Sequence, residues 1–176
     1  MMRDLLYTAF DMACIIDNLG LPIKQSITIA TWMYENDKTY LSEEYRNCCK
    51  KWLLDILYWS EYMQDKIDLD AEFPSIQSIS EGKIDIEAMM RDDFDIDFFF
   101  KKLRVQILYL GKKDYIRMKL RTLMSAYGYK RRSKEFVKFL KDRLAFYHIQ
   151  TSLRGNEICD VETMDNLDDM ITFRVL

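Results

Sequence analysis

The sequence predicts a mainly α protein, in which an N-terminal helical bundle is followed by a basic helical unit with a small C-terminal β hairpin. Three observations support this fold class. The 176 residues include only 5 Gly and 2 Pro, which favours long helices over a many-turned β sandwich. Hydrophobic residues make up 49% of the chain, enough for a buried core. Apolar residues recur at helical spacing along most of the chain and alternate only near its C-terminal end.

Residues 1–67 predict three helices that pack as a bundle. The first runs from Leu5 to a stop at Gly20, and Ser26 caps the second after the chain break at Pro22. The third begins at Ser42. Each helix has one apolar face, so the three faces are buried against each other. The three tryptophans, Trp32, Trp52 and Trp59, are expected in this core, and an apolar patch left over on such short helices predicts a homodimer.

Residues 68–96 are expected to form an acidic linker or loop, with a short strand at 83–86. Within it, Asp70, Glu81 and Lys83 have the spacing of a metal-dependent nuclease site, but residues 80–82 are more typical of a turn. The segment DDFDID, residues 92–97, is interpreted as a solvated acidic entry to a helix, because it lacks the glycine and terminal glutamate of a calcium loop.

Residues 97–176 predict the second unit. The run FFFKKLRVQILYLG is a strongly apolar helix or a buried strand that ends at Gly111. Asp114 can cap a helix over 116–127, and Ser133 can cap another over 133–147. Alternation at 149–153 and 171–175 then predicts two short strands, with a turn at 154–156.

Charge is unevenly distributed along the chain. The net charge of −3 combines −11 in residues 1–100, +12 in residues 101–146 and −4 in residues 147–176. On a helix beginning at Ser133, three lysines lie opposite the apolar face: Lys134, Lys138 and Lys141. A basic block of this size predicts an anionic partner, either a polyanion or an acidic protein surface.

The order of elements around LRTLMSAYGYKRRSKEFVKFLKDRL resembles a winged helix-turn-helix domain over residues 95–176. The resemblance implies a positioning helix at 116–127, a turn at 128–132 and a recognition helix at 133–147 that enters the major groove. The expected nucleic-acid-binding residues are Arg117, Arg121, Lys130, Arg131, Arg132, Lys134, Lys138 and Lys141. Two features depart from that pattern. The segment at the position of the wing, DVETMDNLDD, is acidic and would repel phosphates, and the turn is longer than usual.

The sequence therefore predicts a non-enzymatic, nucleic-acid-associated protein that binds, most simply, duplex DNA through the basic face of residues 112–143. Such a protein would be a regulator or a subunit of a larger DNA-acting assembly. The alternative is an interaction protein whose basic and acidic surfaces pair with each other or with a protein partner, without nucleic acid. We expect no catalytic site, no cofactor and no metal. The four cysteines have no CxxC spacing, and His148 is the only histidine. The interrupted apolar run at the N-terminus predicts no membrane segment, and the chain is expected to be cytoplasmic.

Overall fold

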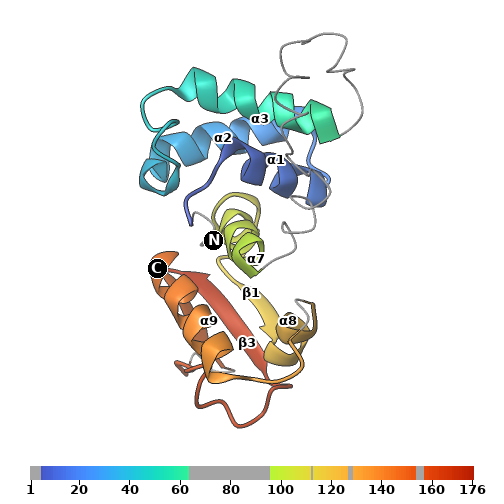
Figure 1. Ribbon diagram of the computed structural model, residues 1–176, viewed down its shortest axis with the longest axis vertical. Helices are drawn as coiled ribbons and strands as arrows, with labels where there is room; N and C mark the ends of the chain where they lie inside the picture. Colours follow the sequence, from blue (N-terminus) through green and yellow to red (C-terminus); the bar gives the residue numbers. More distant parts are fainter. Residues whose placement is uncertain (1–4, 64–95, 112, 127–128, 154–156) are drawn as a thin grey trace. The chain divides into compact units, whose positions relative to one another are not determined.

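Figure 1 shows the computed structural model, which describes residues 5–63, 96–111, 113–126, 129–153 and 157–176. These residues divide into two units, one within Met1–Asp93 and one within Phe94–Leu176. The protein is mainly helical, as predicted, with a small antiparallel sheet in the second unit. Asp70, Glu81, Lys83 and the strand expected at 83–86 lie outside the described residues.

The N-terminal unit contains three α-helices: α1 (Ala9–Asn18), α2 (Ile23–Asn36) and α3 (Cys49–Met63). One turn of 3-10 helix, η1 (Lys38–Tyr40), follows α2. Helix α3 packs against both α1 and α2. The fully buried side chains at the centre of the unit include Met12, Ile15, Ile29, Met33 and Trp52.

Helix α1 begins at Ala9, so its predicted start at Leu5 was wrong. Thr8 and Asp11 form a capping box, in which the Thr8 hydroxyl accepts a hydrogen bond from the Asp11 N–H at 3.1 Å. The Asp11 carboxylate accepts one from the Thr8 N–H at 2.9 Å. The residue before the cap is extended and pairs with a distant segment, since the Tyr7 N–H donates to the Tyr40 carbonyl. Because of this pairing and capping, the helix begins later than periodicity suggests.

The other two predicted helix starts were also displaced. Pro22 is the N-cap of α2, and Ser26 lies inside the helix, where its hydroxyl donates to the Pro22 carbonyl at 3.0 Å. Ser42 precedes a turn at 43–47, and α3 begins at Cys49. Serine is favoured at caps, but its hydroxyl also bonds back to a carbonyl four residues earlier, so it does not mark a start by itself.

The tryptophans divide between the core and the surface. Trp52 is fully buried, and its indole N–H donates to the Ala30 carbonyl of α2 at 2.9 Å. Trp59 is half-buried and packs edge-on against Phe10 at 5.2 Å between ring centroids. Trp32 is 46% exposed, so its predicted place in the core was wrong.

The C-terminal unit consists of α7 (Ile96–Val105), β1 (Ile116–Lys119), α8 (Leu120–Ala126), α9 (Lys134–Phe146), β2 (Ile149–Ser152) and β3 (Met170–Val175). The apolar run of residues 98–111 is thus helical, and a π-helical turn, η2 (Gln106–Leu110), extends α7 up to Gly111. The sheet has the order β1-β3-β2, and both pairings are antiparallel. Helix α9 packs against β2, an edge strand of this sheet.

The predicted helix over 116–127 was wrong in its first half. Residues 116–119 form β1 against β3, with Ile116 opposite Phe173, and the helix begins at Leu120. The guanidinium of Arg117 also donates to the Thr172 hydroxyl at 3.1 Å. The expected two-stranded hairpin is therefore a three-stranded sheet. The physical reason is that β2 pairs with only one edge of β3. A segment that lies along the other edge forms hydrogen bonds with its free N–H and C=O groups, as residues 116–119 do.

The core of the C-terminal unit lies between α7, α9 and the sheet. Phe99 of α7 meets Phe173 of β3 edge-on at 6.1 Å, and Phe100 stacks on Tyr147 at 6.3 Å between ring centroids. The core also holds charge, because the Arg143 guanidinium donates to the Asp97 carboxylate at 2.6 Å. This pair joins the start of α7 to α9.

Candidate anion-binding surface

Helix α9 has the capping and the amphipathic pattern that the sequence predicts. The Ser133 hydroxyl accepts a hydrogen bond from the Phe136 N–H at 3.2 Å. Phe136, Val137 and Leu140 are buried. Just before the helix, the ring of Tyr129 lies 4.3 Å from that of Phe136, which anchors the loop that carries Lys130 and Arg131. The Tyr129–Phe136 contact and the Ser133 cap together hold the backbone of this basic segment in place at the start of α9.

Four of the eight predicted binding residues form an exposed basic surface: Lys130, Arg131, Lys134 and Lys138. They come from the loop before α9 and from its first two turns. Within the described part of the chain, none of the four has an ion pair. The positive end of the helix dipole disfavours cations beside it, unless an anion binds there. We call these four residues the basic surface.

Lys141, one turn further along α9, is held by two carboxylates. Its ammonium group lies 3.1 Å from the Asp160 carboxylate and 2.9 Å from that of Glu162. Hydrogen bonds to Glu162 and then Asp160 raise the pKa of Lys141 above its ordinary value. The Glu162 N–H and the Lys141 ammonium together lower the pKa of Asp160. The positive charge of Lys141 is therefore already balanced by carboxylates of its own unit.

Two predicted arginines also bind the segment between β2 and β3. Arg132 donates to the carbonyls of Val161 at 3.3 Å and Met164 at 2.5 Å. Arg121 of α8 forms an ion pair with Asp168 at 2.9 Å. Arg117, the eighth predicted residue, lies on β1, where its guanidinium also sits 4.9 Å from the Tyr115 ring centre.

We call residues 157–169, between β2 and β3, the acidic loop. It contains six acidic residues and no basic one. The sequence indicated repulsion between this segment and phosphates but not its attachment to Lys141, Arg121 and Arg132. The signal that could have found it is the position of the acidic run, which follows the basic block with only β2 and its flanking residues between them.

The ion pairs of the acidic loop persist at neutral pH. The hydrogen bond and charge of Arg121 lower the pKa of Asp168. The Glu162 N–H and Lys141 lower the pKa of Asp160 in the same way. A carboxylate with a lowered pKa in the folded state contributes stability above the unfolded carboxyl pKa, near 3.9. That contribution is lost as the pH falls through the lowered value.

Asp97 is not the solvated residue that the DDFDID segment predicted. It is buried and paired with Arg143, and residues 92–95 lie outside the described ones. Arg143 lies half a turn away from the lysine row on α9 and packs over the Phe139 ring at 3.5 Å. The sequence pattern did not single out this arginine, because its partner is 46 residues away.

The described residues contain no gathering of three or more His, Cys, Asp or Glu side chains suited to a metal ion. Cys14 and Cys159 are buried, whereas Cys48 is exposed. Burial is the main cause that raises the pKa of the Cys159 thiol. This group is therefore a weak nucleophile at neutral pH.

Comparisons with protein-family models, with curated proteins and with solved structures give no match to the chain. None of the helices in the described ranges is both long and apolar enough to cross a lipid bilayer.

Proposed function

We propose that the chain is a non-enzymatic nucleic-acid-binding protein, a regulator or a subunit of a larger DNA-acting assembly. The observation that carries the proposal is the basic surface. Lys130, Arg131, Lys134 and Lys138 are exposed around the start of α9 and, among the described residues, have no acidic partner. The phosphates of a nucleic acid are suitable ligands for such a cluster, because each contact with the polyanion releases condensed counterions.

The arrangement of the C-terminal unit supports this proposal. Its elements occur in the order helix, strand, helix, helix, strand, strand, and the last strand lies between the other two. We infer that α8, α9 and the strands that follow correspond to the helix-turn-helix and the wing of the domain that the sequence resembles. In that interpretation, α8 is the positioning helix, α9 is the recognition helix and the acidic loop takes the place of the wing. The lysines of α9 then face a duplex from the side opposite its buried face.

The test is a salt titration of binding to duplex DNA with Lys134→Gln/Lys138→Gln. Each lost phosphate contact flattens the slope of log K against log salt by about 0.9, so we expect the double variant to flatten it by about 1.8. Both positions are exposed, and the fold should be unaffected. A matched control is Lys24→Gln/Lys50→Gln, which removes the same charge from exposed positions of the N-terminal unit.

An unchanged slope in the α9 variant would remove these lysines from the interface. Absence of DNA binding by the wild-type protein, even at low salt, would contradict the proposal and leave the second candidate. That candidate is an interaction protein whose basic surface binds carboxylates of a protein partner. The attachment of Lys141 to Asp160 and Glu162 favours it, because it shows that this part of α9 accommodates protein carboxylates.

We further propose that the N-terminal unit forms a symmetric homodimer. Ile23 and Ile27 of α2 are 58% and 38% exposed. Both border an apolar cavity of about 230 Å³, whose other walls include Leu53 and Leu57 of α3. Exposed apolar side chains around a hollow are typical of an interface, and an isologous contact through this patch closes as a dimer.

Ile23→Gln/Ile27→Gln should weaken this dimer at least tenfold, because it places amides in an apolar contact. Light scattering over a concentration series measures the change, and the wild-type dimer should be insensitive to salt. Leu176→Gln is the control, since Leu176 is 79% exposed in the other unit. A wild-type monomer at micromolar concentration would contradict the proposal.

A further inference from the structure

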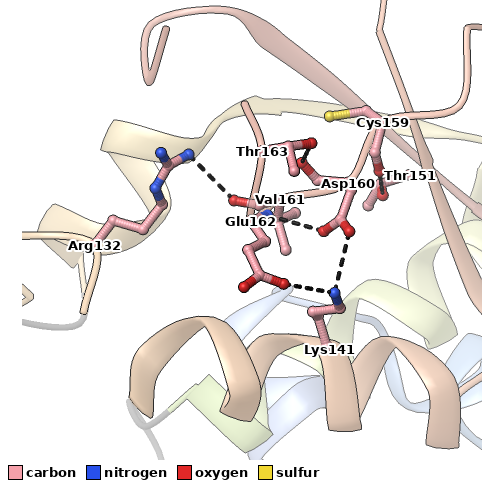
Figure 2. A network of polar contacts seen from close by, with 8 residues as sticks. All are labelled: Arg132, Lys141, Thr151, Cys159, Asp160, Val161, Glu162 and Thr163. Carbon is pink, nitrogen blue, oxygen red and sulfur yellow. Dashed lines mark hydrogen bonds and ion pairs between the residues drawn. The ribbon is translucent and has the colours of Figure 1, made fainter. Parts of the chain in front are cut away.

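The acidic loop lies against the same helix that carries the basic surface. Figure 2 shows the carboxylates of Asp160 and Glu162 converging on the ammonium group of Lys141, while Arg132 reaches the backbone of Val161. A further contact ties the loop to α8, through Asp168 and Arg121. The loop therefore holds a cation on each helix of the proposed helix-turn-helix, Arg121 on α8 and Lys141 on α9.

The loop is anchored by buried residues that alternate with its carboxylates. Cys159 and Val161 are 7% and 2% exposed, whereas Asp160 and Glu162 on either side of Val161 are exposed. The Cys159 N–H donates to the Thr151 carbonyl at 3.0 Å, and the Thr151 hydroxyl donates to the Cys159 carbonyl at 2.6 Å. These contacts fix the base of the loop to β2, so the two carboxylates are presented to Lys141 from an ordered segment.

A turn and a side-chain hydrogen bond hold the tip in place. The Met164 N–H donates to the Asp160 carbonyl at 3.2 Å, and the Glu162 N–H donates to the Asp160 carboxylate at 2.9 Å. Met164 is 5% exposed, and its carbonyl accepts a hydrogen bond from Arg132. The Asp160 carboxylate thus accepts hydrogen bonds from both the backbone of the turn and Lys141.

The chemistry of this contact imitates a bound phosphate. A lysine ammonium has three donors, and the two carboxylates supply anionic oxygens at 2.9–3.1 Å, as phosphate oxygens would. A phosphate that approaches Lys141 therefore meets two carboxylates, which occupy two of its three donors and repel the charge of the phosphate. Exposed ion pairs are weak and screened by salt, so the two carboxylates compete with a phosphate for Lys141 without holding it irreversibly.

We propose that the acidic loop is a built-in competitor that withholds Lys141 from the polyanion, so that α9 of the free protein presents the basic surface but not Lys141. This inference rests on the proposed function. It assigns to the loop a regulatory role at the same surface, in which loss of the two carboxylates from Lys141 adds a phosphate contact on α9.

The test compares two double variants of the loop that remove the same charge. Asp160→Asn/Glu162→Gln removes both carboxylates from Lys141. The side-chain amide oxygen that Asp160→Asn introduces can still accept the hydrogen bond from the backbone N–H of residue 162. Glu157→Gln/Asp165→Asn is the control, because Glu157 and Asp165 are exposed residues of the same loop with no ion pair among the described residues. Any effect of net charge alone is common to both variants.

We expect Asp160→Asn/Glu162→Gln to bind duplex DNA roughly three- to tenfold more tightly at low salt, as the loss of two weak ion pairs allows. Its slope of log K against log salt should be steeper by about 0.9, because Lys141 becomes a phosphate contact. The control should bind with a smaller gain and the wild-type slope. Lys141→Gln should leave the slope unchanged in the wild-type background but flatten it by about 0.9 in the Asp160→Asn/Glu162→Gln background.

If the two loop variants bind DNA with the same affinity and slope, the competitor role is overturned and the proposed function stands. If no variant binds DNA, the proposed function fails, and a poly-glutamate peptide becomes the probe. Tighter binding of that peptide by Asp160→Asn/Glu162→Gln than by the control would then support the competitor role toward an acidic protein partner. Equal or absent binding of the peptide would overturn that role as well.

Discussion

In each unit, a buried aspartate lies near the start of a helix, and the two aspartates accept hydrogen bonds from partners at very different distances along the chain. Asp11 in the N-terminal unit is 4% exposed and accepts hydrogen bonds from the backbone and hydroxyl of Thr8, three residues away. Asp97 in the C-terminal unit is 5% exposed and pairs with Arg143, 46 residues away. The first contact belongs to local helix capping, whereas the second forms only when α7 and α9 have packed together.

In the N-terminal unit, the ion pairs of Lys51 with Glu44 and Asp55 lie at the surface, whereas the C-terminal unit has a buried one. Its core includes the buried ion pair, and its surface ties an acidic loop to α8 and α9. In the N-terminal unit, the centre is filled by residues such as Trp52, Met12 and Ile29. Mutations of charged residues should therefore have unequal effects in the two units.

The largest effect is expected for Asp97→Asn. The substitution leaves the charge of Arg143 buried without its carboxylate, and breaking such a pair costs about 3–5 kcal/mol of unfolding free energy. Hydrogen exchange of the full chain should show faster exchange in α7 and α9. The control is Asp142→Asn, which removes an exposed charge from α9 and should change little. Equal exchange in the two variants would show that the pair does not stabilise the unit.

Loss of either helix cap should lower the unfolding free energy by less than Asp97→Asn does, and by the same amount in the two units. Thr8 caps α1 and Ser133 caps α9, each through a hydroxyl that accepts a backbone hydrogen bond. Thr8→Ala and Ser133→Ala should each cost about 1 kcal/mol, because local capping is independent of how the rest of the unit is charged. Tryptophan fluorescence during denaturation reports the first variant, since Trp32, Trp52 and Trp59 lie in the N-terminal unit, and hydrogen exchange of α9 reports the second. A much larger loss at Ser133 would mean that this cap also holds the basic surface together.

Much of α9 could be predicted from the sequence. The cap at Ser133, the buried side of Phe136 and the opposite row of lysines follow from spacing within a single helix. The alternation at 149–153 and 171–175 also located β2 and β3. In contrast, three predicted helix starts in the N-terminal unit were displaced, because serine hydroxyls have alternative local partners and the segment before α1 pairs with a distant one.

The sequence by itself determined the mainly helical class, the approximate positions of the helices and the amphipathic character of α9. These features depend on hydrogen bonds and apolar contacts between residues three or four positions apart. Only the tertiary structure decided that residues 116–119 form a strand, that Asp97 pairs with Arg143 and that the acidic loop holds Lys141. The partners in these contacts lie 19 or more residues apart, so they meet only after the chain has folded. Four of the eight predicted binding residues consequently form an open surface, while the fold gives Lys141, Arg121, Arg132 and Arg117 partners inside the same unit.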